Sequence, residues 1–152
     1  MSHDLFITHA WRYHDDWTRV SDLLDRAGIR WRNFSVPWHD PAMSANSRTG
    51  GEFIRSWLES QIIPVHGVIF LDSVYAVSSA CKWLDLELEM ARKHGKPVVA
   101  LPPHGQTEVS ETVRRRVDAV VPWDAGEIIG AFARLRTAAQ ERRAEPSGEA
   151  HP

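Results

Sequence analysis

Two short apolar runs, at residues 66–71 and 97–101, lie on either side of an amphipathic helical stretch, and this arrangement restricts the possible folds most. Apolar runs of this length indicate buried strands, and a helix that connects two of them is typical of parallel pairing. Strands are expected at 4–8, 29–36, 67–72, 97–101 and 119–121. This repeated alternation predicts an α/β fold in which about five parallel strands form a sheet with helices on both faces.

Helical periodicity separates the expected strands. The first helix is expected at 15–27, with acidic residues at its start and Gly28 at its end. Further helices are expected from 51 or 52 to 62, between the two apolar runs, at 108–118, and after Asp124 to about 140. Asp124 is the type of residue that caps a helix start.

The chain is expected to form a single domain over residues 1–140. Its 152 residues are enough for one substantial core and too few for two ordinary domains. Residues 37–51 are rich in Pro, Ser, Asn and Gly and predict a long irregular loop, a kind of segment that often carries function. Residues 141–152 are charged or small and bury too little to become ordered, which predicts a disordered C-terminal tail.

Charge and composition limit the expected partners and location. A formal net charge of −2 gives no electrostatic reason to expect nucleic acid or an anionic membrane as a partner. No apolar run approaches the roughly 20 residues that span a bilayer, and the N-terminus lacks the profile of a signal peptide. The one cysteine, Cys81, excludes an internal disulfide framework and suits a reducing compartment. These features predict a cytoplasmic protein.

One acidic residue of the central helical stretch lies among apolar neighbours. Trp83, Glu87 and Ala91 share a stripe at helical spacing, and Leu84 and Leu88 flank it. The acids at positions 85 and 89 fall on more polar sides of the helix. A carboxylate on such a stripe either pairs with an arginine or a backbone amide or takes part in chemistry, and the periodicity leaves both interpretations open.

The carboxyl ends of the strands are the expected binding edge, because ligands of open parallel sheets bind there. That edge collects residues 9–11, 35–38, 72–75 and Pro102. No Gly-rich turn follows the first strand, so neither a dinucleotide fold of the usual kind nor a P-loop is indicated. The histidines are scattered and do not indicate a metal site, and the serines lack a nucleophile-elbow pattern.

Four segments carry a family resemblance: LFITHAW at 5–11, NFSVP at 33–37, WLDLELEMA at 83–91 and GKP at 95–97. From residue 4 to about 101 the chain resembles the TIR-like (ThsB-like) domains of the bacterial Thoeris antiphage defence system, a branch of the TIR superfamily. The resemblance implies a three-layer, flavodoxin-like TIR fold. In TIR enzymes a tryptophan precedes the catalytic glutamate by four positions, which assigns the catalytic role to Glu87. Cys81 stands where the family usually has serine. At this position the chain therefore lacks a hydroxyl that would contact a ribose or a phosphate.

The resemblance implies an NAD+ glycohydrolase or ADP-ribosyl cyclase. Such an enzyme cleaves the nicotinamide–ribose bond and releases ADP-ribose or a cyclic isomer that acts as a signal in antiphage immunity. NAD+ is then the substrate, no cofactor or metal is expected, and a separate effector protein reads the diffusible product. Association of the chain with copies of itself, as a homo-oligomer, is also expected as an option. The residues expected to contact the substrate are Phe6, His9, Ala10, Trp11, Ser35, Pro37, Tyr75 and Trp83.

Two other functions remain open at this point. A TIR-type interaction module would assemble through its loops, chiefly the loop at 37–51, and would act as a scaffold without catalysis. A nucleotide sensor would hold NAD+ or a derivative without turnover. The effect of changing Glu87 separates the enzyme from both alternatives, because neither of them needs a catalytic acid.

Overall fold

Five parallel strands form the sheet in a computed structural model that describes residues 2–8, 15–33, 48–75 and 81–144. Their spatial order is β2-β1-β3-β4-β5, and every pairing is parallel. The strands are β1 (His3–Ile7), β2 (Trp31–Asn33), β3 (Gly67–Leu71), β4 (Val98–Leu101) and β5 (Ala119–Val120). The predicted sheet of five parallel strands is confirmed.

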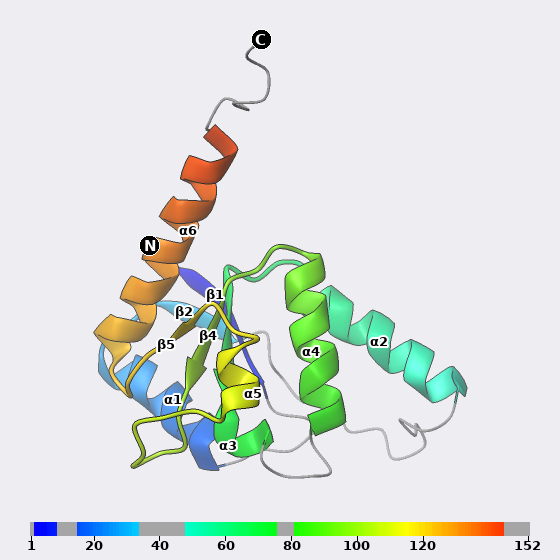
Figure 1. Cartoon of the computed structure of the whole chain (residues 1–152), viewed down its shortest axis with the longest axis horizontal. Coiled ribbons are helices and arrows are strands. Elements are labelled where there is room, and N and C mark those ends of the chain that lie inside the picture. Colours follow the sequence, from blue (N-terminus) through cyan, green and yellow to red (C-terminus); the bar gives the residue numbers. More distant parts are fainter. Residues whose placement is uncertain (1, 9–14, 34–47, 76–80, 145–152) are drawn as a thin grey trace.

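Helices cover both faces of this sheet. They are α1 (Asp15–Arg26), α2 (Arg48–Ile62), α3 (Asp72–Tyr75), α4 (Cys81–Lys93), α5 (Glu111–Arg114) and α6 (Ala125–Ala144). Figure 1 shows α1 and α6 on one side of the sheet and α2 and α4 on the other, which gives the three layers expected from the sequence. Within the described ranges no helix is both long and apolar enough to cross a membrane.

The core is centred on β3 and β4, which are buried at every position. Strands covered on both faces need apolar residues throughout, and the continuous apolar sequences of these two strands meet that need. In the register of the sheet, Phe6 of β1 lies beside Val68, and Ile69 lies beside Val99. This register brings the carboxyl ends of β1, β3 and β4 to one edge.

The packing of α6 on the sheet depends on Gly67, the first residue of β3. A Cβ atom at this position would overlap the aromatic ring of Phe132, which is fully buried in α6. Glycine therefore lets the helix approach the strand more closely than any other residue would.

The edge strand β2 is attached to β1 by a paired arginine and aspartate. Arg32 donates from Nε and Nη2 to the two carboxylate oxygens of Asp4, at 2.6 and 2.7 Å. Asp4 is buried, and the hydrogen bonds from Arg32 hold the pKa of its carboxyl below the usual range. The bidentate geometry fixes the orientation of both side chains.

The second strand is shorter than the predicted 29–36. Gly28 ends α1 with a positive φ of 73°, and the N–H of Ile29 donates to the carbonyl of Leu24. Because this bond belongs to the end of the helix, Ile29 is unavailable to the sheet, and β2 begins at Trp31. Positions 34–36 lie outside the described residues. The other four strands agree with the predicted bounds to within one residue.

Three helix bounds also differ from the prediction. Helix α2 begins at Arg48 instead of 51 or 52. Helix α5 covers Glu111–Arg114 instead of 108–118. Its start follows Ser110, whose backbone is extended and whose N–H is bonded to Asp72. Helix α6 continues to Ala144, so the first residues of the predicted disordered tail are helical. Two arginines in its last turn favour this extension, since cations stabilise the negative end of a helix dipole.

Candidate functional site

Helix α4 carries one buried carboxylate, that of Glu87. Its residue exposure is 2%, and Leu84, Leu88 and Ala91 around it are buried as well. The predicted apolar stripe is therefore buried at its described positions, and Glu87 lies on it. Burial strengthens the electrostatic effect of a carboxylate on any charge that develops near it. The catalytic role of Glu87 stays a prediction at this point.

The other two acids of α4 lie on its surface and form ion pairs. Asp85 is 45% exposed in its side chain and accepts from Arg116 at 2.5 Å. Glu89 is 60% exposed and lies 3.5 Å from Arg55 of α2. Exposed pairs of this kind contribute little to stability, and they occupy both carboxylates with arginine. This difference in environment separates Glu87 from its two acidic neighbours.

The C-terminal end of α4 is held against α2 by Glu59. The Oε2 atom of Glu59 lies 2.8 Å from Nζ of Lys93 and 2.7 Å from Nε2 of His94. The hydrogen bonds from Lys93 and then His94 lower the pKa of Glu59. These contacts help to fix the helix that positions Glu87.

The carboxyl ends of β1 and β3 are joined by Thr8. Its buried hydroxyl accepts the N–H of Leu71 at 2.9 Å, and its own N–H donates to the carbonyl of Ile69 at 3.0 Å. The threonine continues the pairing of the two strands beyond the last residue of β1. The chain segments that follow the two strands therefore start from fixed positions at the expected binding edge.

Asp72 connects the end of β3 to the segment before α5. Its two carboxylate oxygens accept the hydroxyl of Ser110 at 2.8 Å and the N–H of the same residue at 3.0 Å. Asp72 is buried, so both bonds compensate for the loss of water around its charge.

A second buried aspartate at this edge is Asp16, in the first turn of α1. One of its oxygens accepts the N–H of His104 at 3.2 Å, and the other accepts from Arg19 at 2.7 Å. His104 follows β4 in the sequence, so this bond joins the start of α1 to the segment after β4. The edge is thus fixed by carboxylates whose partners come from distant parts of the chain.

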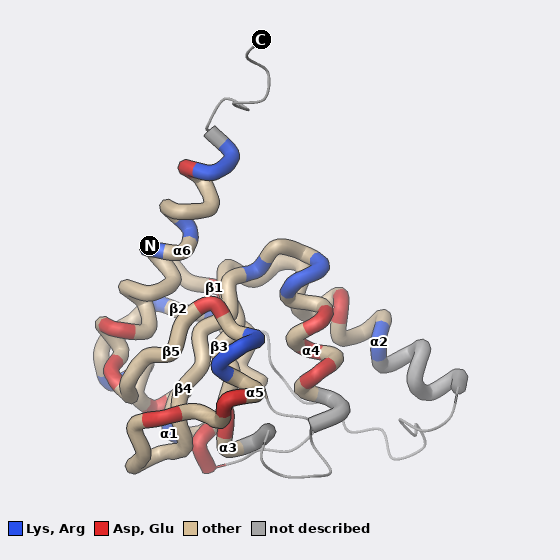
Figure 2. The backbone as a smooth tube through the Cα atoms, viewed as in Figure 1, with Lys and Arg blue, Asp and Glu red and all other residues tan. Residues whose placement is uncertain are grey.

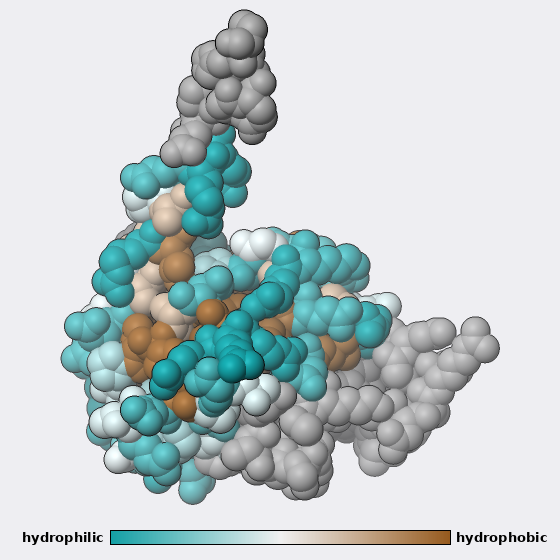
Figure 3. Space-filling view, in the orientation of Figure 1, coloured by the Kyte–Doolittle hydropathy of each residue, from teal (hydrophilic) through white to brown (hydrophobic). Residues whose placement is uncertain are grey.

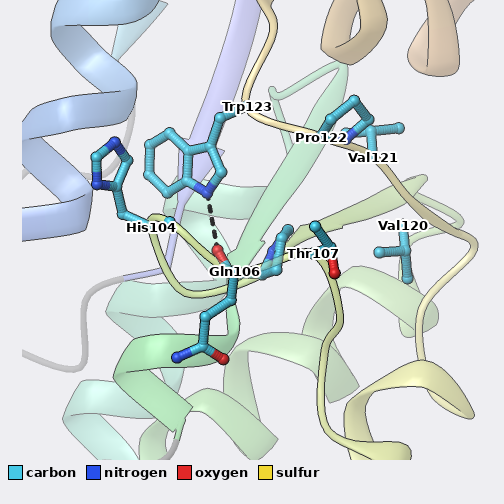
Figure 4. Close-up of a pocket in the computed structure, with 9 residues that line it drawn as sticks. His104, Gln106, Thr107, Val120, Val121, Pro122 and Trp123 are labelled. Atoms are coloured by element: carbon cyan, nitrogen blue, oxygen red, sulfur yellow. Dashed lines mark hydrogen bonds between the residues drawn. The ribbon is translucent and has the colours of Figure 1, made fainter.

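A cavity of about 340 Å³ opens at the carboxyl ends of β4 and β5. Figure 4 shows Trp123 on one side of it, with the edge of the His104 ring against the indole. The ring centroids are 5.1 Å apart, and the indole N–H donates to the carbonyl of Pro102 at 2.8 Å. The volume of the cavity is within the range of small-molecule pockets. The sequence placed Pro102 at the binding edge but did not predict this cavity.

The predicted contacts with the substrate stay predictions. Phe6 is buried in the core, with a residue exposure of 0%. Tyr75 ends α3 and Trp83 lies one turn before Glu87 in α4, but their side chains are outside the described part. The remaining predicted contacts lie outside the described residues: His9, Ala10, Trp11, Ser35 and Pro37.

Within the described ranges, no group of three or more His, Cys, Asp or Glu side chains could hold a metal ion. The site as described therefore consists of one buried carboxylate on α4 and a hydrogen-bonded edge that joins the ends of β1, β3 and β4.

Comparison with known proteins identifies one family. The model of the family described as "Thoeris protein ThsB, TIR-like domain" matches residues 6–108, a range that includes Glu87, the end of β1 and the whole of β2, β3 and β4. The sequence has no match among curated proteins.

Two solved structures are similar to this chain. A 2-deoxyribosyltransferase from Bacillus psychrosaccharolyticus has a TM-score of 0.54 and 16% identity, and the alignment covers 87% of this chain and 95% of that one. The CMP N-glycosidase BcmB from Clostridium botulinum has a TM-score of 0.43 and 10% identity, with 86% and 98% covered. At this identity the first likeness shows a shared α/β fold.

Proposed function

This chain belongs to the Thoeris ThsB family through its TIR-like domain, and from this premise we propose that it is an enzyme that cleaves the nicotinamide–ribose bond of NAD+. Glu87 is the proposed catalytic residue. The products would be nicotinamide and either ADP-ribose or a cyclic isomer of ADP-ribose. The fold shared with a 2-deoxyribosyltransferase agrees with a reaction at a glycosidic bond.

The observation that carries the proposal is the burial of Glu87. It is the one acid of α4 that lies on the apolar side of the helix, and it follows Trp83 at the spacing of TIR enzymes. An ionised carboxylate is costly to bury, and groups of this kind concentrate at functional sites. The surface acids Asp85 and Glu89 have arginine partners and offer no comparable reason for a catalytic role.

One carboxylate is enough for this reaction. Ordinary glycosidases need two, because the leaving oxygen has to be protonated. In NAD+ the nicotinamide ring is cationic, and the electron pair of the broken C–N bond makes it neutral, so no general acid is required. The positive charge that develops on the ribose is then stabilised by the negative charge of Glu87.

The fate of the ribose cation determines the product. Attack by water gives ADP-ribose, with the proton of that water released to solvent. Attack by an atom of the same molecule gives a cyclic product, and this outcome requires that water is kept away from the reacting carbon. We propose that the cyclic product is the antiphage signal and that a separate effector protein binds it.

The experiment compares the wild-type protein with two single variants. Purified protein is incubated with NAD+, and the nucleotides are separated and identified by mass spectrometry. Glu87→Gln is expected to abolish the product, whereas Glu89→Gln, two residues further along the same helix and on its surface, is expected to retain it. Equal NAD+ consumption by Glu87→Gln and the wild type would overturn the proposal. An unchanged antiphage phenotype in Glu87→Gln would favour the scaffold interpretation.

A further inference from the structure

A cleft of about 570 Å³ opens at the amino ends of the central strands, at the edge of the sheet opposite to the site described above. Its walls come from the segments that precede β3, β4 and β5 and from the C-terminal half of α6. Figure 1 shows α6 extending beyond the sheet on this side.

Positive charge dominates this cleft. Its lining contains five permanent cations: Arg92, Lys96, Arg136, Arg142 and Arg143. The one carboxylate in the lining, Asp118, already accepts the N–H of Val98 at 2.7 Å. The cleft therefore has an excess of four positive charges, although the whole chain has a formal net charge of −2. Figure 2 shows lysine and arginine positions near the end of α4 and along the last turns of α6.

The cations of the cleft have no carboxylate partners within the described part of the chain. Among the ion pairs found there, none contains any of the five residues. Arg92 donates to the backbone carbonyl of Arg116 at 2.6 Å, which leaves its charge uncompensated. By contrast, Arg19, Arg55 and Lys93 each lie beside a carboxylate. The cleft thus retains charge that a bound anion could neutralise.

Stabilisation of α6 explains part of this charge but not all of it. Arg142 and Arg143 lie in the last turn, where cations interact favourably with the helix dipole. Arg92 lies in the last turn of α4, where the same effect applies. Arg136 lies about two turns before the end of α6, and Lys96 belongs to the connection between α4 and β4. These two cations therefore line the same cleft without that reason.

The lowered pKa of His3, which lies near the cleft, agrees with a positive electrostatic potential in the cleft. Burial and then the charge of Arg136 lower the pKa of His3. His66 lines the cleft, and its Nδ1 accepts the N–H of Asp4 at 3.2 Å. With Nδ1 as an acceptor, Nε2 carries the ring proton, so His66 can donate a hydrogen bond to a ligand.

The residue types indicate the chemistry of the ligand. Four of the five cations are arginines, whose planar guanidinium groups bind phosphate oxygens in pairs. Pro97 and Leu135 lie in the same lining, are partly exposed and supply apolar surface for a flat ring. Figure 3 shows this combination along α6, where apolar surface on the flank toward the sheet is bordered by hydrophilic residues. A nucleotide with more than one phosphate group combines these two properties.

We propose that the cleft is a binding site for a small molecule that contains a nucleoside diphosphate group. The inference does not depend on the proposed function, because the cleft and Glu87 belong to different parts of the fold. The volume is within the range of pockets for small ligands. A nucleic acid would instead need cations distributed along its evenly spaced phosphates, whereas here they converge on one cavity.

The test is calorimetric titration of the purified full chain with ADP, AMP and adenosine. ADP is expected to bind, AMP to bind more weakly and adenosine not to bind. A higher salt concentration is expected to weaken the binding of ADP, because salt screens charges. The double variant Arg136→Gln/Arg143→Gln is expected to bind ADP roughly tenfold more weakly, as expected for the loss of charged hydrogen bonds. The double variant Arg114→Gln/Arg115→Gln loses the same charge on α5, outside the cleft, and is expected to match the wild type.

Two further measurements distinguish the cleft from the Glu87 site. Glu87→Gln is expected to retain the affinity for ADP, and the ring signals of His66 in NMR spectra are expected to shift when ADP is added. Equal weakening in both double variants, loss of binding in Glu87→Gln, or an unmoved His66 would overturn the proposal. Tighter binding of duplex DNA than of ADP would also overturn it. Thermal melting followed by circular dichroism verifies that each variant is folded.

Discussion

The two edges of the sheet use charge in opposite ways. At the carboxyl edge the charged groups are buried carboxylates, and Asp16 and Asp72 each hold a backbone N–H from a distant segment. At the amino edge the cleft has an excess of cations, and those of the cleft have no ion-pair partner in the described part of the chain. A buried charge needs fixed partners, whereas an exposed charge is hydrated and can exchange water for a ligand. One edge therefore suits fixed geometry and the other suits capture of a mobile anion.

The largest effect is expected at Glu87. Glu87→Gln should lower kcat/KM for NAD+ by roughly 10²–10³, the usual effect of removing one group that stabilises charge in the transition state. Glu89→Gln should change it little, because that side chain is exposed. Steady-state kinetics of NAD+ consumption measure both variants. Similar losses in the two would mean that burial does not separate the acids of α4.

The next effect concerns the fixed partners of the carboxyl edge. Asp72→Ala removes both bonds to Ser110 and should lower the free energy of unfolding by about 1–3 kcal/mol. Ser110→Ala removes the hydroxyl bond alone and should cost less. Urea denaturation with an unchanged m-value measures both. An unaltered midpoint in Asp72→Ala would show that the bonds to Ser110 do not hold this edge.

A pH effect is expected from Asp4, the buried carboxylate nearest to the amino edge. Arg32 lowers the pKa of Asp4 in the folded protein below its ordinary value of 3.8, so the ion pair stabilises the fold above that pH. This contribution should be lost progressively as the pH falls from about 4 toward the lowered pKa. As the pH falls across this range, the melting temperature of Asp4→Asn should decline less than that of the wild type. Equal declines in the two proteins would contradict this expectation.

The smallest effect on stability is expected for the cations of the cleft. Arg142→Gln/Arg143→Gln removes two exposed charges without partners in the described part of the chain and should change the free energy of unfolding by no more than about 0.5 kcal/mol. Urea denaturation measures it. A loss comparable to that of Asp72→Ala would mean that these arginines are structural, and the contrast between the two edges would fail.

The positions of strands and of the catalytic candidate could be predicted because both depend on local periodicity. Four strand bounds agree within one residue, and Glu87 lies on the buried stripe that its spacing from Trp83 and Ala91 indicated. The depth of a side chain is harder to predict. Phe6 belongs to a short apolar run, and only the fold shows that its residue exposure is 0%. An aromatic residue in a short apolar run gives no local sign of whether its ring will be buried or exposed.

The sequence by itself determined the alternation of strand and helix, the parallel sheet and the face of α4 that holds Glu87, because these follow from contacts between residues close in the chain. Tertiary structure alone decided where α5 begins, because the segment before it is held by the bond between Ser110 and Asp72. It also assembled the basic cleft from residues as far apart as His66 and Arg143. Each of these cations is an ordinary surface residue in the sequence, and only the fold brings them together.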